Sequence, residues 1–139
     1  MKSIDLNCDM GELPQAIADG TQESLMPFLT SVNVACGGHA GDEGTMMATI
    51  EQALRWKLAV GAHPSYHDRS HFGRRELQVS PLAIADSIFE QVRTLDRVAE
   101  NCGAQLVTSS RMERSTIKRR ASALLQRPLP PASPAGTGT

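Results

Sequence analysis

Polar side chains recur at every second position near the start of the chain, within the segment Ile4–Glu12. Because side chains alternate between the two faces of a strand, Asp5, Asn7 and Asp9 are predicted to share one face. Carboxylates and amides are costly to bury without partners, so such a face lines a site or meets water. A strand that ends in Gly-Glu12 and delivers polar groups into a site is one interpretation. An edge strand with one solvated face fits the spacing equally well.

The same spacing of oxygen-bearing residues occurs at the start of calcium-binding loops. Such a loop needs Gly at its sixth position and Glu at its twelfth, where this chain has Met10 and Ala16. A calcium loop is therefore excluded. The sequence also contains neither GxxxxGK[ST] nor GxGxxG, so it indicates no loop for nucleotide phosphates.

Two histidines, His39 and His63, each follow a predicted strand directly. Sites in α/β proteins are built at the carboxyl ends of parallel strands, so both histidines are candidates for a site. The alternative is that each is a hydrogen-bonded structural histidine. His67 and His71 continue the spacing, but they lie in a polar loop after Pro64 and are expected to be solvated.

The pair Arg74-Arg75 follows Phe72-Gly73 in the same loop. Arginine offers bidentate hydrogen bonds, so the pair could clamp an anionic group. Two surface salt bridges are the alternative explanation.

Short apolar strands alternate with amphipathic helices along the chain. After the first strand, strands are predicted at 31–36 and 58–63, and 104–107 begins a fourth. A helix over 43–57 has Asp42 as its N-cap, and a second begins at Ser80-Pro81. The second helix ends at Gly103 and has an apolar stripe of Ile84, Ile88, Val92, Leu95, Ala99 and Cys102. This alternation predicts a parallel α/β arrangement.

The composition is that of one modest domain, with 139 residues and 15.0 kDa. A formal net charge of −1 argues against a general nucleic-acid or membrane-surface binder. The sequence has no apolar signal region and no apolar run near the roughly 20 residues of a membrane helix. Its three cysteines are widely spaced and form no CxxC pair. We therefore expect a reduced, cytoplasmic setting.

The near-zero net charge hides a difference between two parts of the chain. Residues 1–106 hold 8 Lys and Arg against 14 Asp and Glu, whereas residues 107–139 hold 6 against 1. Helix and strand periodicity stops after residue 107, and the Pro-rich end is of low complexity. We predict a structured portion over 1–107 and a disordered, basic and Pro-rich tail over 108–139.

Several segments together resemble the LamB/YcsF family, which includes the A subunit of bacterial 5-oxoprolinase. They are Asp5–Glu12, Leu25–Asp42, Gly61–Pro64 and Phe72–Arg75. They are long and follow in the family's order, and the resemblance covers residues 3–106, less than half of a usual family member. It implies an α/β fold that is the N-terminal part of a distorted (β/α) barrel of the glycoside hydrolase/deacetylase type, incomplete in this chain.

The resemblance also implies a role in the ATP-dependent cleavage of 5-oxoproline to L-glutamate, together with partner subunits B and C. A lactam is an unactivated amide, so coupling to ATP can activate its carbonyl for attack by water. Asp5, Asp9 and Glu12 would orient or deprotonate that water, and His39 and His63 would polarise the substrate or hold a divalent metal. These five are the candidate catalytic residues. The candidate substrate-binding residues are Asn7, Asp42, Arg74 and Arg75.

The family continues its fourth strand with His-Val-Lys-Pro-His-Gly-Ala-Leu-Tyr-Asn, and this motif is absent here. Codons chosen for residues 108–120 encode it in full when they are regrouped after one added nucleotide. Met112-Glu113 leaves little freedom, because ATG-GAR regroups to GGA and forces the glycine. We therefore hypothesise a single-nucleotide frameshift near codon 107, with residues 108–139 translated out of frame.

Three functional hypotheses follow. By descent, the chain is an enzyme component, the A subunit of a 5-oxoprolinase. Alternatively it is an inactive truncated fragment, because a complete barrel needs roughly 200–250 residues. A third alternative is that the basic tail from Arg111 to Arg127 binds nucleic acid or anionic lipid, although a frameshift explains its charge without any function.

Overall fold

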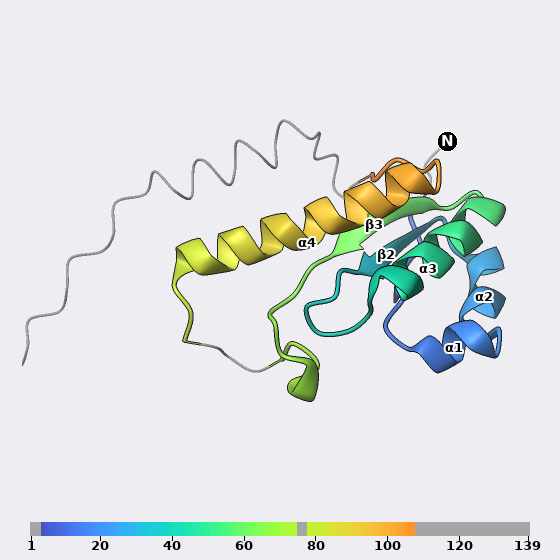
Figure 1. Ribbon diagram of the computed structural model, residues 1–139. Helices are drawn as coiled ribbons and strands as arrows, with labels where there is room; N and C mark the ends of the chain where they lie inside the picture. Colours follow the sequence, from blue (N-terminus) through green and yellow to red (C-terminus); the bar gives the residue numbers. More distant parts are fainter. Residues whose placement is uncertain (1–3, 75–77, 108–139) are drawn as a thin grey trace, which may run out of the picture.

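Three parallel strands form the sheet at the centre of the structure (Figure 1). The computed structural model describes residues 4–74 and 78–107, so the tail predicted for 108–139 lies outside the described residues. The strands are β1 (Asn7–Met10), β2 (Ser31–Ala35) and β3 (Ala59–His63), and they pair in chain order. A parallel bridge between Val60 and Leu106 places the next segment beside β3, where the fourth strand was predicted to begin.

Helices connect the strands and cover the sheet. They are α1 (Pro14–Ala18), α2 (Thr21–Leu25) and the 3-10 turn η1 (Met26–Phe28) before β2, then α3 (Glu43–Arg55), the 3-10 turn η2 (Arg69–His71) and α4 (Pro81–Asn101). Figure 1 shows α3 and α4 side by side against the sheet, and residues of both helices contact β3. Within the described part of the chain, no helix is both long and apolar enough to cross a membrane.

Local side-chain chemistry sets the starts of the two long helices. The Asp42 carboxylate accepts from the backbone N–H of Thr45, and the Thr45 hydroxyl accepts from the backbone N–H of Asp42. This reciprocal capping box begins α3. Ser80 accepts from the N–H of Ala83 and stands before Pro81 at the start of α4. Each cap contributes about 1 kcal/mol, and both predicted helix starts are confirmed.

The ends of several predicted elements are shifted. The helix expected over 43–57 ends at Arg55, and the strand expected from Leu58 begins at Ala59. The first strand ends at Met10, because Gly11 has a φ of +79° and turns the chain out of the extended conformation. The loop expected over 12–29 contains two short helices and a 3-10 turn.

The hydrophobic core lies between the sheet and the pair α3 and α4. Val32 and Val34 of β2, Ile50 of α3 and Leu95 of α4 are fully buried there. Burial of each such side chain contributes roughly 1.5–3 kcal/mol relative to exposure. The core therefore fixes the sheet through one of its two faces.

Packing of α4 changes along its length. Leu95, Val98 and Ala99, in the carboxyl-terminal half, are buried, whereas Ile88 is 40% exposed and Phe89 is 43% exposed. The predicted apolar stripe is thus confirmed as core toward its carboxyl-terminal end. Toward the amino-terminal end the helix extends past the described part of the core.

The opposite face of the sheet is polar. The amide of Asn33 donates to Asn7 Oδ1 at 2.6 Å and to Asp9 Oδ1 at 3.0 Å, and Asn7 donates to Ser31 Oγ at 2.8 Å. Gly61 on β3 leaves room for this network, since a Cβ there would lie 2.8 Å from Asn33 Oδ1. The polar face predicted for β1 therefore exists, and it continues across β2 as a hydrogen-bonded ladder.

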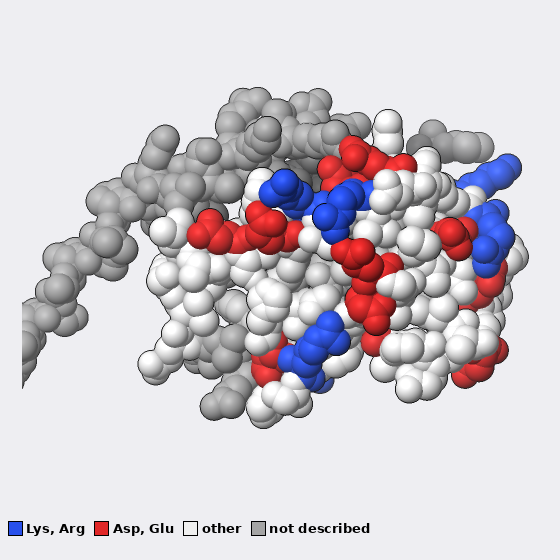
Figure 2. Space-filling view, in the orientation of Figure 1, with Lys and Arg blue, Asp and Glu red and all other residues white. Residues whose placement is uncertain are grey.

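Acidic and basic side chains are interspersed on the surface shown in Figure 2. Arg97 of α4 lies 2.6 Å from a carboxylate oxygen of Glu43 of α3, and Arg55 lies 3.0 Å from Glu23. Such exposed ion pairs contribute at most about 1 kcal/mol each. The described surface in this view is mixed in charge rather than dominated by one sign.

Candidate functional site

Glu12 enters the site through a tight turn at the end of β1. The preceding Gly11 has φ +79°, and a Cβ on it would lie 3.1 Å from Thr49 Oγ1 of α3. The buried backbone N–H of Gly11 donates to Gln22 Oε1 at 2.8 Å. Only glycine fits this turn without strain, and the turn directs Glu12 past the carboxyl end of the strand.

Buried amides fix that turn from behind. Gln22 of α2 donates to Thr49 Oγ1 at 3.2 Å and to Gln52 Oε1 at 2.8 Å, and both partners lie on α3. These polar groups are buried but fully hydrogen-bonded, which makes them a rigid support rather than a liability. The sequence analysis missed this support.

His39 lies in the loop that follows β2 and is 4% exposed. Its Nε2 is 2.7 Å from Glu12 Oε1, and its Nδ1 is 2.6 Å from Ser65 Oγ. Arg69 stabilises the loop, because its guanidinium donates to the carbonyl oxygens of Gly37 and Gly41 on either side of the histidine. His39 is therefore held at both ring nitrogens and through its backbone.

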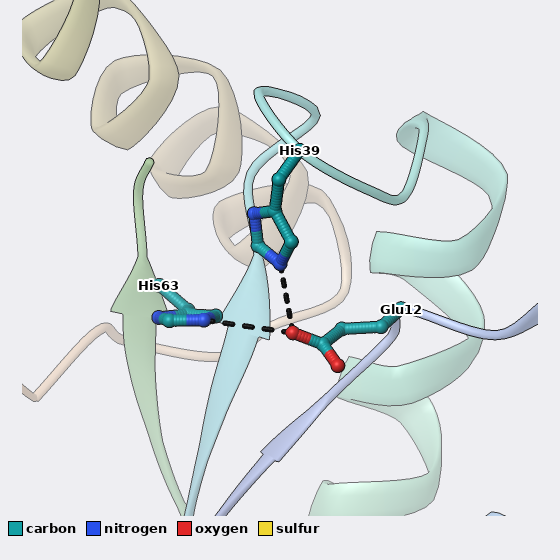
Figure 3. A group of neighbouring side chains, drawn as sticks. All are labelled: Glu12, His39 and His63. Carbon is teal, nitrogen blue, oxygen red and sulfur yellow. Dashed lines mark hydrogen bonds and ion pairs between the residues drawn. The ribbon is translucent and has the colours of Figure 1, made fainter. Parts of the chain in front are cut away.

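His63 is the last residue of β3 and reaches the same carboxylate (Figure 3). Its Nε2 lies 3.5 Å from Glu12 Oε1 and 3.6 Å from Asp9 Oδ2, and its side chain is 34% exposed. The rings of His63 and His39 meet edge to face at a centroid distance of 4.9 Å. The three strands thus deliver two imidazoles and two carboxylates to one place.

Glu12, His39 and His63 form a group of potential metal ligands. One ligand atom from each residue can be chosen so that all three atoms lie within 4.8 Å of one another. Two imidazole nitrogens with one carboxylate oxygen is a donor set typical of catalytic zinc sites with an open position. The group borders a cavity of about 340 Å³ lined by Asp9, Glu12, His39, His63, Ser65, Phe72, Gly73 and Arg74.

The other sequence-predicted residues lie in different places. Asp5 is at the opposite end of β1, where it accepts hydrogen bonds from the hydroxyls of Thr30 and Ser31. These hydrogen bonds hold the pKa of the Asp5 carboxyl below its usual value. Asn7 belongs to the polar ladder, between Asp5 and the site. The structure therefore does not bring Asp5 and Asn7 to the Glu12 cluster.

The candidate substrate-binding residues outside β1 are also separated. Asp42 uses its carboxylate to cap α3. Arg74 lines the cavity, with its guanidinium carbon 5.8 Å from the centroid of the Phe72 ring. Arg75 lies outside the described residues. His71 is bonded to Asp68 at 2.9 Å, and its side chain is 53% exposed, as expected for a solvated loop histidine.

Three residues around His39 were not found from the sequence: Ser65, Arg69 and Gln91. Ser65 follows His63-Pro64 directly, so its nearness to a candidate histidine was a usable signal. Arg69 was hidden in a polar loop, and Gln91 lies on a helix 26 residues beyond the serine that it contacts. Nothing in the spacing of the sequence pairs these two with the site.

Comparisons with other proteins agree with this geometry. Over 106 residues the chain is 43% identical to the 5-oxoprolinase A subunit of Bacillus cereus (strain B4264) and 42% identical to that of Bacillus mycoides (strain KBAB4). In both cases the matched region is 76% of this chain and 42% of the relative. The chain therefore spans less than half the length of these curated relatives.

Among solved structures, the chain is similar to the crystal structure of Lactam Utilization Protein from Thermus thermophilus. The TM-score is 0.71 and the sequence identity 29%, covering 89% of this chain and 53% of that chain. That protein has a (β/α) barrel, which confirms the predicted fold class, with this chain matching part of the barrel. Residues 4–110 match the sequence pattern of the LamB/YcsF family, and with these relatives the match shows that the chain belongs to the LamB/YcsF family.

Proposed function

We propose that this chain supplies the amino-terminal part of an active site that opens the cyclic amide 5-oxoproline to L-glutamate. The names of its relatives, a 5-oxoprolinase component and Lactam Utilization Protein, support this substrate class. The observation that carries the proposal is the meeting of Glu12, His39 and His63 at the carboxyl ends of three successive parallel strands. This is where α/β barrels place their catalytic groups.

Hydrolysis of a lactam needs a water molecule that is oriented and deprotonated beside the carbonyl carbon. Glu12 is the proposed base, because it contacts both histidines and borders the cavity. Asp9 is the second carboxylate at this point, 3.6 Å from His63, and is proposed to orient the water. His39 and His63 are proposed to polarise the lactam oxygen. Asp5 keeps its place in the proposal only as a support of the β1 ladder.

A divalent metal fits the residues that are present. Glu12, His39 and His63 would hold it with one oxygen and two nitrogen ligands, and Asp9 lies beside them. When bound, such an ion polarises a carbonyl oxygen and lowers the pKa of a coordinated water. The protein groups around it would orient the substrate in the cavity, where Arg74 is available for a carboxylate.

ATP and the partner subunits B and C belong to the same proposal. The sequence has no phosphate-binding glycine loop, so we infer that activation of the lactam by ATP takes place with the partners. The relatives are named as one lettered component of an enzyme, which supports a complex of several chains. We place this reaction in the cytoplasm, as expected from the sequence.

An inactive fragment is the second candidate, and a specific observation favours it. The chain covers 42% of its relatives, and the polar face of the described sheet is left facing solvent. Under this hypothesis the frameshift near codon 107 removed the groups that face Asp9 and Glu12 in a whole barrel. Resequencing the locus decides the frameshift, since it requires a one-base difference from intact homologous DNA.

The decisive experiment combines the purified chain with subunits B and C of a bacterial 5-oxoprolinase and measures ATP-dependent release of glutamate from 5-oxoproline. Turnover comparable to that of a full-length A subunit would establish the enzyme and refute the fragment hypothesis. In that case Glu12→Gln should lower turnover by roughly 10²–10⁴-fold, the usual contribution of a general base.

Glu90→Gln is the matched control, because Glu90 lies exposed on α4 and pairs with Arg93 at 3.5 Å. It should leave turnover unchanged. Absence of turnover for the wild-type chain, beside an active full-length relative in the same assay, would establish the fragment hypothesis and refute the enzyme.

A further inference from the structure

His39 is the most enclosed member of the cluster, and its chemistry depends on which ring nitrogen holds the proton. Its Nε2 faces Glu12 Oε1 at 2.7 Å and its Nδ1 faces Ser65 Oγ at 2.6 Å. A neutral imidazole donates through one nitrogen and accepts through the other. Ser65 can therefore decide what His39 presents to Glu12 and His63.

The backbone of Ser65 is fixed by a single side chain of α4. Gln91 accepts from the N–H of Ser65 at 3.1 Å and donates to its carbonyl oxygen at 2.8 Å. Gln91 also donates to Ser87 Oγ at 3.1 Å and is only 5% exposed. Its amide is thus oriented by three partners, and Ser65 has little freedom to move away from His39.

Two glycines allow this close approach. A Cβ on Gly38 would lie 2.7 Å from both Ser65 Oγ and Gln91 Oε1, and a Cβ on Gly73 would lie 3.0 Å from His39 Cβ. Contacts below 3.0 Å to backbone or fixed polar atoms are not tolerated. The loops bearing His39, Ser65 and Gly73 are therefore packed against one another at backbone distance.

The hydroxyl hydrogen of Ser65 has an acceptor away from the histidine, because Ser65 Oγ donates to the carbonyl oxygen of Tyr66 at 3.2 Å. The lone pairs of Ser65 Oγ are then free to accept from His39 Nδ1. With the proton on Nδ1, Nε2 of a neutral ring presents a lone pair toward Glu12. Two acceptors at 2.7 Å need a proton or a cation to hold them together.

We propose that Ser65, clamped by Gln91, is a positioning residue that accepts the Nδ1 proton of His39 and so makes Nε2 a ligand toward the Glu12 and His63 side. Outer hydrogen-bond partners of this kind fix the ring orientation of metal-binding histidines. The use of that ligand rests on the proposed function. The direction of the Ser65 hydrogen bond does not rest on it.

The first test uses the wild-type 139-residue chain without metal. Long-range ¹H–¹⁵N correlation spectra of its labelled histidines report which ring nitrogen of His39 carries the proton. We expect the proton on Nδ1. An Nδ1 that lacks a proton, and accepts from Ser65 instead, would overturn the proposal without any variant.

The second test titrates zinc into the wild-type chain and into three variants by calorimetry. Ser65→Ala should weaken zinc binding by roughly 10–100-fold, as loss of an outer partner usually does. Ser65→Thr keeps the hydroxyl and should restore both the affinity and the Nδ1 proton. Ser70→Ala is the matched control, because Ser70 bonds Asp68 and His71 instead, and it should bind zinc like the wild type.

The outcomes separate the two ideas. Equal zinc affinity in Ser65→Ala and the wild type would overturn the positioning role, even if the proton is on Nδ1. A wild-type chain that binds no zinc would contradict the metal in the proposed function, and the spectra of His39 would still decide the Ser65 proposal. If Ser65→Ala fails to fold, the wild-type spectrum and Ser65→Thr decide the proposal.

Discussion

The two faces of the three-stranded sheet differ in how they are stabilised. On the face toward α3 and α4, Val32 and Val34 are fully buried against apolar side chains. On the other face, Asn7 and Asp9 are exposed even though both are bonded to Asn33. In a (β/α) barrel the second face lines the interior. The comparison indicates that the apolar face holds the described fold together, while the polar face and its carboxyl end hold the chemistry.

The largest expected effect tests the apolar face on a single helix. Leu95→Ala should lower the free energy of unfolding by about 2–5 kcal/mol, because it opens a cavity under a fully buried leucine. Ile88→Ala on the same helix should cost less than about 0.5 kcal/mol, since Ile88 is 40% exposed. Urea unfolding of both variants measures the difference. Equal losses would show that the amino-terminal half of α4 is packed as tightly as the carboxyl-terminal half.

Cys36, a core residue just after β2, gives a pH test of the same face. Burial raises the pKa of its thiol to about 11, from a usual value of 9.0. The folded chain therefore keeps this proton after the unfolded chain has lost it, so stability is unaffected below pH 9 and falls between about 9 and 11. The expected loss is roughly 2–3 kcal/mol.

The measurement compares unfolding of the wild type and Cys36→Ala from about pH 8 to about pH 11, a range that brackets both pKa values. The variant should show less decline over this range, because it lacks the thiol. Parallel declines in the two proteins would mean that Cys36 titrates like an exposed thiol.

The polar face should be less sensitive. Asn33→Ala removes the amide that joins Asn7 to Asp9, and we expect a loss of about 0.5–1.5 kcal/mol, the usual net value of such hydrogen bonds. Denaturant unfolding gives this value, with Leu95→Ala as reference. A loss as large as that of Leu95→Ala would show that the ladder, rather than the apolar core, organises the sheet.

The smallest effect concerns Asp5 at the amino end of the ladder. Hydrogen bonds from Thr30 and Ser31 hold the pKa of this carboxyl below its usual 3.8. A lowered pKa in the folded chain stabilises it above about pH 4, and the contribution disappears as the pH falls through the folded value. Asp5→Asn should therefore differ from the wild type at about pH 6 and converge with it near pH 2 in thermal unfolding. A difference that persists at the acidic end would contradict this account.

Elements of the fold with strong local signals were predictable from sequence. Asp42 and Ser80 announced the two long helices, because capping depends on residues a few positions away. The alternation around Asp5, Asn7 and Asp9 gave the polar face of β1 for the same local reason. The short helices before β2 were missed, since segments of five residues leave little periodicity to detect.

The site was only partly predictable. Glu12, His39 and His63 were found because each follows a strand, and parallel strands end at one edge. Asp5 shares a strand face with Asp9 but lies at the far end of it, and alternation says nothing about position along a strand. Gln91 depends on how α4 packs across β3, a tertiary arrangement that the order of residues does not encode locally.

The pairing of the strands in chain order has a consequence for synthesis on the ribosome. Each strand finds its neighbour already made, and Leu106 joins β3 only after the ligands Glu12, His39 and His63 have emerged. Amino-terminal segments of a growing chain fold first, at about 5–20 residues per second. The ligand set can thus be assembled while the growing edge of the sheet is still open. A nascent chain of this kind depends on timely delivery of its next strand, or on a chaperone at that edge, to avoid pairing with the wrong partner.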